Sequence, residues 1–269
     1  MTGIVISGAV INAKFRNPLA EPSLIGISAG AALSAALLMV FLSTSLSLLF
    51  WLLPLAAFLG GLFMTWLVYL LGLRLGDMTS AGLLLAGIAI NAVAAAALAL
   101  ISYLADAEQL RQLVFWTLGS FAGASWSSTA LTAVLILIAA VGLLRLAVPL
   151  NCLLLGEKEA GHLGLNVASI RKRAIAFSAV TVGAAVAATG IIGFVGLVVP
   201  HLVRLLAGPD QGLLLPASAL LGASLLVLAD LLARLVIAPA ELPIGILTAL
   251  LGGPFFIWLL LRQHGLSHA

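Results

Sequence analysis

The sequence predicts an all-α protein that crosses a membrane several times, and three observations lead to this fold class. Of the 269 residues, 63% are hydrophobic and only 8% are charged. A soluble domain carries about a quarter charged residues. The mean hydropathy is +1.27. Apolar stretches close to the roughly 20 residues that a membrane-spanning helix needs recur along the chain.

The predicted spans are separated by glycine, proline or charged residues at most of their joins. The stretch 193–207 is short and contains Pro200, so we expect a broken or half-length span there. The whole chain, 1–269, is expected to form a single transmembrane domain. The predicted spans cover residues 24–50, 52–71, 81–104, 127–150, 174–192, 193–207, 213–236 and 243–261.

The chain opens with MTGIVISGAVINAKF, an apolar segment that is too short to span a membrane alone. Its basic residues, Lys14 and Arg16, follow the apolar run, whereas those of a signal peptide precede it. This pattern is typical of the second half of a helix. We therefore expect about nine segments, from a fold in which a first helix and part of the second are lacking.

The positions of lysine and arginine predict the orientation, because cytoplasmic loops carry an excess of these residues. With a cytoplasmic C-terminus, ten of the twelve basic residues lie inside or at that boundary. Only Arg111 and Arg234 fall outside. The opposite orientation would place ten basic residues outside, so the C-terminus is predicted to be cytoplasmic.

Two polar insertions separate the predicted spans. The cytoplasmic insertion, 151–173, has apolar residues at helical spacing, which favours docking on a partner. A surface helix lying on lipid head groups is the alternative. The insertion 105–126 is predicted to be external, where Trp116 and Trp126 suit a membrane-interface belt.

Three charged residues gather near the external end of the predicted span 213–236. Asp230 and Arg234 lie four residues apart on one helix face, and Glu241 follows after a short turn. They form either a rim that engages a partner or substrate, or an ion pair that neutralises itself at the membrane edge. Charged residues near spans are functional candidates by default.

The stretch GFVGLVVPHLVRLLAGPD, 193–210, combines polar and small residues in an apolar setting. We interpret Arg204 as reaching the cytoplasmic boundary and His201 as satisfying its polar groups against a neighbouring helix. Three glycines at three-residue spacing predict close helix packing, with a hinge as the alternative. They are Gly190, Gly193 and Gly196.

No catalytic constellation is visible in the sequence. It contains no Walker A loop, no HExxH motif and no nucleophile elbow. The four histidines have no partner at metal-ligand spacing, and Cys152 is the only cysteine, so we expect neither a metal site nor an internal disulfide. The dispersed net charge of +3 argues against a nucleic-acid partner. The chain is therefore not expected to be an enzyme, and another subunit must supply the energy for any active transport.

Several motifs, in order, resemble the permease subunits of ABC importers for iron–siderophore complexes, haem and cobalamin (the FecCD type). The similarity runs from about residue 5 to residue 262. The motifs are FRNPLAEPSLIGISAGAAL at 15–33, LLLAGIAIN at 83–91, FWTLGSFAGASW at 115–126, LNCLLLGEKEAGHLGL at 150–165, GFVGLVVPHLVRLLAGPD at 193–210 and the stretch 213–262.

This resemblance implies a ten-helix type II ABC importer permease in the cytoplasmic (inner) membrane that works by alternating access. It implies a homodimer around a central path, two cytoplasmic ATPase subunits and a periplasmic or lipid-anchored substrate-binding protein, all in membrane lipid. ATP and magnesium would be bound by the ATPase, and this chain would hold no cofactor. A secondary transporter is the alternative from another class, but it would need a relay of ionisable residues within the membrane, to which only Asp230 comes near.

The resemblance also implies roles for particular residues. Arg234 matches an arginine that pairs with the binding protein, and Glu241 lies beside it. Leu85, Gly87 and Asn91 belong to the helix that lines the path. The coupling helices that grip the ATPase would fall within 150–168. The residues assigned to this coupling loop are Leu155, Gly156, Glu157, Glu159, His162, Leu163 and Gly164.

The sequence departs from the family at two places. An external RLPR-like stretch of the family has no counterpart before Met1, so we expect the chain to be a fragment, to have a late start or to be a degraded copy. Gln211 and Gly212 stand where relatives have a basic, histidine-containing pair, which predicts a weakened cytoplasmic contact. The motifs at 115–126 and 156–164 look closest to those of haem permeases, so haem is the first expected substrate, with ferric siderophores and cobalamin as alternatives.

Overall fold

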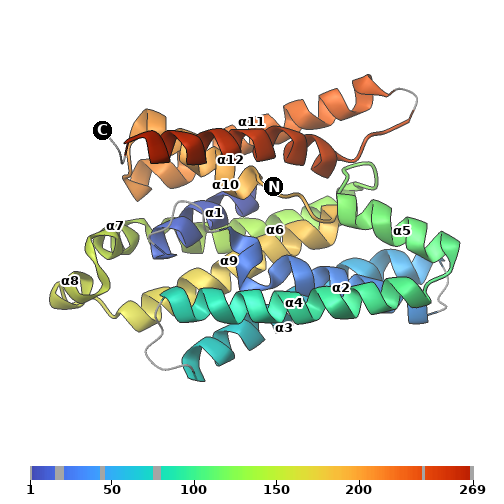
Figure 1. The fold of residues 1–269 in the computed structure, drawn as a ribbon, viewed down its shortest axis with the longest axis horizontal. Helices are drawn as coiled ribbons and strands as arrows, with labels where there is room; N and C mark the ends of the chain where they lie inside the picture. Colours follow the sequence, from blue (N-terminus) through green and yellow to red (C-terminus); the bar gives the residue numbers. More distant parts are fainter. Residues whose placement is uncertain (1, 16–20, 43–45, 75–79, 238–239, 267–269) are drawn as a thin grey trace.

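The computed structural model describes residues 2–15, 21–42, 46–74, 80–237 and 240–266, and within these ranges it contains helices and no strand. Figure 1 shows them as one elongated bundle. In chain order they are α1 (Thr2–Phe15), the 3-10 helix η1 (Pro22–Ile25), α2 (Ile27–Phe41), α3 (Leu46–Arg74), α4 (Ser80–Leu104), α5 (Ala107–Leu118), α6 (Trp126–Leu144), α7 (Ala147–Leu155), α8 (Glu157–His162), α9 (Val167–Thr189), α10 (Val195–Ala207), α11 (Gln211–Val236) and α12 (Ile244–Leu266).

Four described helices are long and apolar enough to cross a membrane: Trp51–Arg74, Gly82–Leu104, Trp126–Leu144 and Gln211–Val236. Their surfaces carry many exposed apolar side chains, among them Leu85, Leu137 and Leu220. A soluble protein of this size does not expose so much apolar surface, whereas lipid solvates it. The predicted all-α membrane fold is confirmed.

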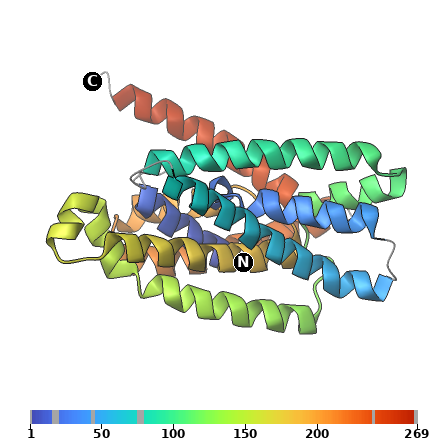
Figure 2. The ribbon, with the colours of Figure 1, turned by 90° about the horizontal axis from the view of Figure 1, so that it is seen from below.

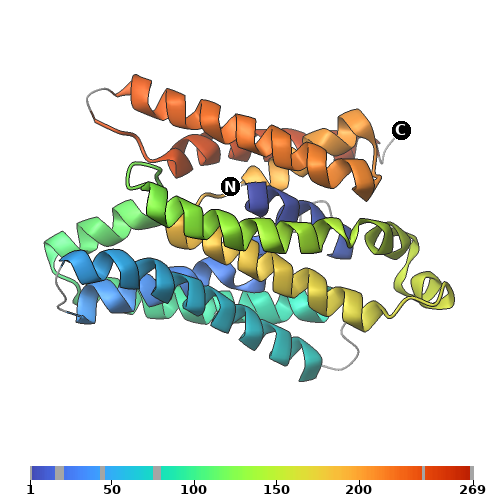
Figure 3. The same cartoon turned by 180° about the vertical axis from the view of Figure 1, so that it is seen from behind.

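Helix α1 lies in the interior of the bundle. It contacts α6, α9, α10 and α11, and every residue from 3 to 13 is buried. In Figure 3 it runs between α6 on one side and α10 and α11 on the other, from the middle of the molecule towards one end. A helix that is apolar on all sides has no solvent face, so complete burial is the expected outcome.

Small residues bring α1 very close to its neighbours. A Cβ atom on Gly8 would overlap the backbone carbonyl oxygen of Gly196 in α10, and one on Gly222 of α11 would overlap the side chain of Val5. In a membrane the hydrophobic effect does not drive helices together, because lipid is as apolar as their side chains. Close packing contacts of this kind therefore contribute much of the helix–helix association. The crossing of α1 and α10 therefore depends on glycine at position 8.

The predicted span 24–50 is wrong as a single helix. Pro22 opens the short helix η1, Gly26 adopts a positive φ of 86°, and α2 then runs only from Ile27 to Phe41. Glycine is the residue that adopts this conformation without strain. Helix α3 begins at Leu46, so residues 46–50 belong to the next element.

Two further boundaries differ from the prediction. The predicted span 127–150 breaks at Arg145 and Leu146, and α7 starts at Ala147. Pro149 lies in the first turn of α7, where a missing N–H costs nothing. Helix α9 begins at Val167 rather than 174, because the Asn166 side chain accepts a hydrogen bond from the Ser169 N–H and caps it.

The bundle has two distinct ends, here called the α8 end and the α5 end (Figure 1). Helices α7 and α8, the α10–α11 turn and the C-terminal end of α12 lie at the α8 end, and α5 and the end of α11 lie at the other. In Figure 2, α9 runs between α3 and α6, and it contacts both of them. Arg111 of α5 and Arg234 of α11 thus share the end opposite to the basic residues around α8.

His201 has a different contact from the one expected. Its ring packs edge-on against Phe255 of α12, with centroids 6.1 Å apart and planes at 70°. Neither ring nitrogen has a hydrogen-bond partner in the described part of the chain. The contact with the neighbouring helix is therefore aromatic packing, and the expected polar contact is wrong.

Candidate functional site

The most distinctive surface of the chain is formed by α7 and α8, which project at the α8 end (Figure 1). Gly156, with φ 140° and ψ 151°, makes the sharp turn between them, a conformation open mainly to glycine. Glu157 and Glu159 lie in the first turn of α8, where the helix dipole favours negative charge. A second glycine with a positive φ, Gly164 at 81°, ends the unit. We call residues 147–164 the α7–α8 unit.

One clamp fastens this unit to α9. The guanidinium of Arg171 donates to the carboxylate of Glu157. The Arg171 side chain is 8% exposed and that of Glu157 is 44% exposed. A nearly buried arginine requires an anionic partner, because an unpaired buried charge is costly. Glu157 therefore bonds to its own chain, and its carboxylate fixes α8 on α9.

A second clamp joins α7 to the turn between α10 and α11. The Asn151 side chain donates to Asp210 Oδ1 at 2.6 Å, and its own oxygen accepts from the Gln211 N–H at 2.9 Å. The hydrogen bonds from Asn151 and from the Gly212 N–H hold the pKa of the Asp210 carboxyl below its usual value. Asn151 lies in the motif at 150–165, but no role was predicted for it; an amide in an otherwise apolar run was the available signal.

The outward face of the α7–α8 unit exposes two leucines beside two polar side chains. Leu155 is 68% exposed and Leu163 is 62% exposed. Beside them the side chains of His162 and Glu159 are 81% and 65% exposed, with 3.9 Å between Nδ1 and Oε2. Exposed leucines on a rigid projection mark an interaction surface. Of the seven residues assigned to the coupling loop, six are exposed and Gly156 is buried. Among the exposed six, Glu157 differs because its carboxylate is bound by Arg171 of α9.

At the α5 end, Arg234 forms an ion pair within its own helix. Its Nε lies 3.0 Å from Asp230 Oδ2, and its Nη1 lies 3.9 Å from Glu241 Oε1. The Arg234 side chain is 48% exposed, so part of the guanidinium still faces outward. The internal ion pair and docking of a partner are thus compatible, because a guanidinium carries five N–H donors.

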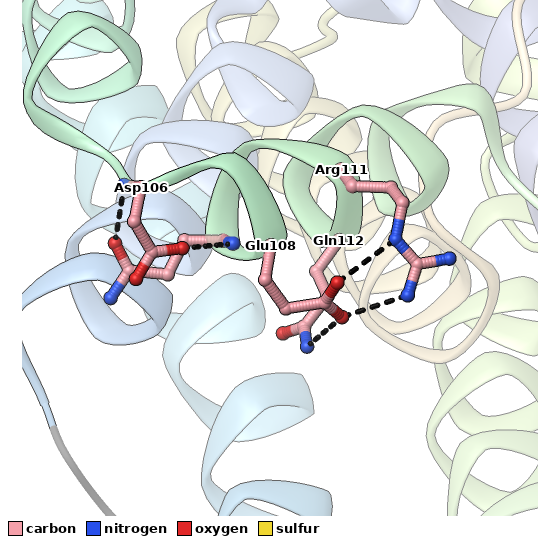
Figure 4. Close-up of polar contacts among 5 residues, drawn as sticks. Asp106, Glu108, Arg111 and Gln112 are labelled. Atoms are coloured by element: carbon pink, nitrogen blue, oxygen red, sulfur yellow. Dashed lines mark hydrogen bonds and ion pairs between the residues drawn. The ribbon is translucent and has the colours of Figure 1, made fainter.

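Helix α5 presents a second polar cluster at the same end (Figure 4). Arg111 makes two hydrogen bonds to Glu108, of 3.0 and 2.8 Å, and Gln112 donates to the same carboxylate at 3.0 Å. The hydrogen bond from Arg111 is the main reason why the pKa of Glu108 is lowered. Asp106 and Gln109 form a capping box at the start of the helix. Both arginines predicted to be external are therefore paired with acids.

The three residues expected to line the path do not share one face of α4. Leu85 is 64% exposed. Gly87 is buried and so close to η1 that a Cβ atom would overlap the carbonyl oxygen of Leu24. Asn91 donates to the carbonyl of Ser23 at 3.2 Å. Gly87 and Asn91 thus fasten α4 to η1, and only Leu85 faces outward.

Glu21 is a site residue that the sequence reasoning missed. One carboxylate oxygen accepts from the N–H of Phe194 at 3.1 Å, and the other accepts from the Ser23 hydroxyl at 3.0 Å. Phe194 begins α10 with φ 67°, the only positive φ of a non-glycine residue in the described ranges. The two residues are 173 positions apart, so only the fold brings them together. Glu21 holds the break between α9 and α10 in place.

Replacing Glu21 by alanine is expected to destabilise the break and to lower the unfolding temperature. The Phe194 N–H would lose a charge-assisted hydrogen bond, at a cost of about 1–3 kcal/mol. Glu21→Gln keeps an acceptor oxygen at the same position and is the matched control. Thermal unfolding in detergent measures both, and an unchanged unfolding temperature in Glu21→Ala would show that the carboxylate does not hold Phe194.

A family model described as the FecCD transport family matches residues 2–262. The chain belongs to the FecCD transport family. The hemin transport system permease protein HmuU of Yersinia pestis is 48% identical over 262 residues, which cover 97% of this chain and 78% of that protein. The vitamin B12 import system permease protein BtuC of Vibrio cholerae is 42% identical over 261 residues, with the same coverage.

A solved structure extends this FecCD assignment to three dimensions. It is described as an inward-facing conformation of a metal-chelate type ABC transporter, and it superposes with a TM-score of 0.89 at 37% identity. The match covers 97% of this chain and 82% of that one. The chain is therefore a multi-pass membrane permease of a metal-chelate, haem or cobalamin type ABC importer.

In the described ranges, no group of three or more His, Cys, Asp or Glu residues could hold a metal ion.

Proposed function

We propose that this FecCD permease carries haem across the cytoplasmic membrane, driven by ATP hydrolysis in a partner subunit. The observation that supports it most is the α7–α8 unit, which exposes Leu155 and Leu163 on a projection fixed by two clamps. The 48% identity to a hemin permease favours haem over the alternatives. Ferric siderophores and cobalamin remain the second candidates, since a cobalamin permease is 42% identical.

The exposed surfaces support the following assembly. Two cytoplasmic ATPase subunits dock on the α7–α8 units of a homodimer, and they bind ATP and magnesium, so this chain needs no cofactor. A periplasmic or lipid-anchored binding protein docks at the α5 end, where Arg234 and Glu241 lie. This arrangement makes the α8 end cytoplasmic, and the C-terminal end of α12 lies there too.

Force then reaches the helices through the clamps. Movement of the α7–α8 unit pulls α9 through the pair of Arg171 and Glu157. It also pulls the α10–α11 turn through Asn151. The two helices that meet at the strained Phe194 are thus driven together, which is how one docking surface opens and closes the path. We infer alternating access of this kind, in which the chain performs no chemistry.

Reconstitution with partner subunits tests this function. The chain is placed in liposomes with its ATPase subunit and its substrate-binding protein, and ATP hydrolysis is measured with haem, a ferric siderophore and cobalamin. We expect haem to stimulate hydrolysis most. If a ferric siderophore or cobalamin stimulates hydrolysis most, that ligand replaces haem as the proposed substrate. Uptake driven by an ion gradient without ATP would show that the protein is not part of an ATP-driven importer.

Leu163→Glu is expected to uncouple the transporter. An apolar side chain of this size contributes about 1.5–3 kcal/mol when an interface buries it, which corresponds to about tenfold or more in affinity for the ATPase. Ligand-stimulated ATP hydrolysis should fall by about that factor, while the amount of folded permease stays the same. The matched control is Leu163→Met, which keeps the apolar contact. Normal coupling in Leu163→Glu would refute docking at this surface.

A further inference from the structure

A pocket at the α8 end lies beside the docking surface, and Gly164 of the α7–α8 unit is one of its lining residues. It is an open pocket with a volume of about 550 Å³, lined by the end of α6, by α7 and by the start of α9. Figure 3 shows α6 and α9 side by side there, with α7 continuing from α6. The polar side chains that line it are those of Arg145, Asn166, Ser169 and Arg173, and no acidic residue lines it.

The two arginines of this pocket differ from others in the chain. Arg111, Arg171 and Arg234 each pair with a carboxylate. Arg145 directly follows α6 and Arg173 lies in α9, and neither side chain has an ion-pair or hydrogen-bond partner among the described residues. Two cations that face one hollow repel each other unless an anion lies between them. Arginine pairs also match the geometry of a phosphate group.

The end of a long helix adds to this positive potential. Helix α9 has 23 residues and begins at Val167, directly beside the pocket. The amide groups of a first helical turn attract anions. The Asn166 side chain already accepts from the Ser169 N–H, so the helix end supports the arginines rather than forming a site alone.

An exposed apolar stripe leads away from the pocket along α6. Successive turns of the helix contribute its residues, at spacings of three or four positions, so they lie along one side of α6. The stripe ends next to Arg145. Such a stripe can bind the acyl chains of a phospholipid, whereas a free inorganic anion has no apolar part that could contact it. The stripe consists of Val134, Leu137, Ile138, Val141 and Leu144, which are 54%, 64%, 65%, 46% and 39% exposed.

We propose that the pocket between Arg145 and Arg173 binds the phosphate of an anionic phospholipid, whose acyl chains lie along α6. The site is at the boundary where basic residues gather, so the headgroup lies at the depth expected for the cytoplasmic leaflet. A zwitterionic lipid fits less well, because its choline or ethanolamine cation would lie near two guanidinium groups. This proposal concerns lipid and is independent of the substrate carried.

Lipid titration of the purified full chain tests the proposal. The chain is delipidated in detergent, and its thermal unfolding is followed with phosphatidylglycerol, with phosphatidylcholine of the same acyl chains, and with inorganic phosphate. We expect phosphatidylglycerol to raise the unfolding temperature at the lowest concentration. Equal stabilisation by inorganic phosphate would overturn the lipid assignment, and equal stabilisation by phosphatidylcholine would overturn the requirement for an anionic headgroup.

Variants then locate the site. Arg145→Gln/Arg173→Gln is expected to weaken the effect of phosphatidylglycerol about tenfold or more, because it removes two charge-assisted contacts. Lys172→Gln is the matched control, as Lys172 is exposed on α9 next to Arg173 but does not line the pocket. Arg145→Lys/Arg173→Lys keeps both charges and should retain most of the binding.

Native mass spectrometry provides a second readout that does not depend on stability. One phosphatidylglycerol per chain should be lost in the glutamine double variant and kept in the control. If the double variant keeps this lipid but loses the ATPase subunit, the pocket belongs to the protein interface and the lipid proposal is wrong.

Discussion

Gly8→Leu is expected to prevent the bundle from folding, and even Gly8→Ala is expected to lower its stability by about 1–3 kcal/mol. Gly8 is buried in the middle of α1, and a Cβ atom there would overlap the backbone carbonyl oxygen of Gly196. A backbone atom cannot rotate away as a side chain can. The whole of α10 would therefore have to move outward, and the break at Phe194, where α10 begins, would have to move with it.

Gly253→Ala is the matched control for this prediction. Gly253 also lies in a helix of the bundle, α12, but a Cβ atom there would have no heavy atom within 4 Å. Alanine is a better helix former than glycine by roughly 1 kcal/mol, so this variant should be neutral or slightly more stable. The measurements are the yield of monodisperse protein and its unfolding temperature in detergent. Equal behaviour of the alanine variants at 8 and 253 would rule out a close α1–α10 crossing.

The same crossing shows what the sequence could and could not predict. The three-residue spacing of Gly190, Gly193 and Gly196 predicted close helix packing. The structure finds it at Gly190, against the Trp116 carbonyl, and at Gly196, but Gly193 has no heavy atom within 4 Å of a built Cβ. The contact at Gly8 was not predicted, because α1 is apolar on every side and its hydrophobic pattern has no periodicity that would indicate a contact face.

Helix existence was predictable from hydropathy, whereas helix ends were not. An apolar run continues through the breaks at Gly26 and at Leu146, so composition alone joined separate helices there. The contacts that fix the ends are polar and distant in sequence. Glu21 and Phe194 are 173 residues apart, and Asn151 and Gln211 are 60 apart. A single sequence contains no signal for such pairs until the fold is known.

The coupling loop divides into residues that face a partner and residues that face the permease. Both kinds occur in one short motif, so the resemblance assigned them a single role. Leu163 is exposed, whereas Glu157 bonds to Arg171 of α9. Docking and transmission are therefore separate tasks of neighbouring residues, and separate variants should dissociate them.

Arg171→Leu is expected to abolish the transmission of force to α9 while leaving ATPase docking intact. The leucine fills part of the nearly buried site, and Glu157, 44% exposed, can turn to water, so we expect a modest loss of stability of about 1–3 kcal/mol. Transport should fall about tenfold or more, with ATP hydrolysis no longer stimulated by the ligand-loaded binding protein. Lys172→Leu, the exposed neighbour on α9, should transport normally.

The contrast between Arg171→Leu and Leu163→Glu identifies the route of the force. Co-purification of the ATPase should survive in the first variant and fail in the second, although both lose transport. If Arg171→Leu transports normally, α9 is not driven through Glu157. The connection from Asn151 to the α10–α11 turn must then carry the whole movement, and Asn151→Leu should show the loss instead. A loss in both variants, with ATPase still bound, means that α9 and α10 must move together, as their shared break at Phe194 requires.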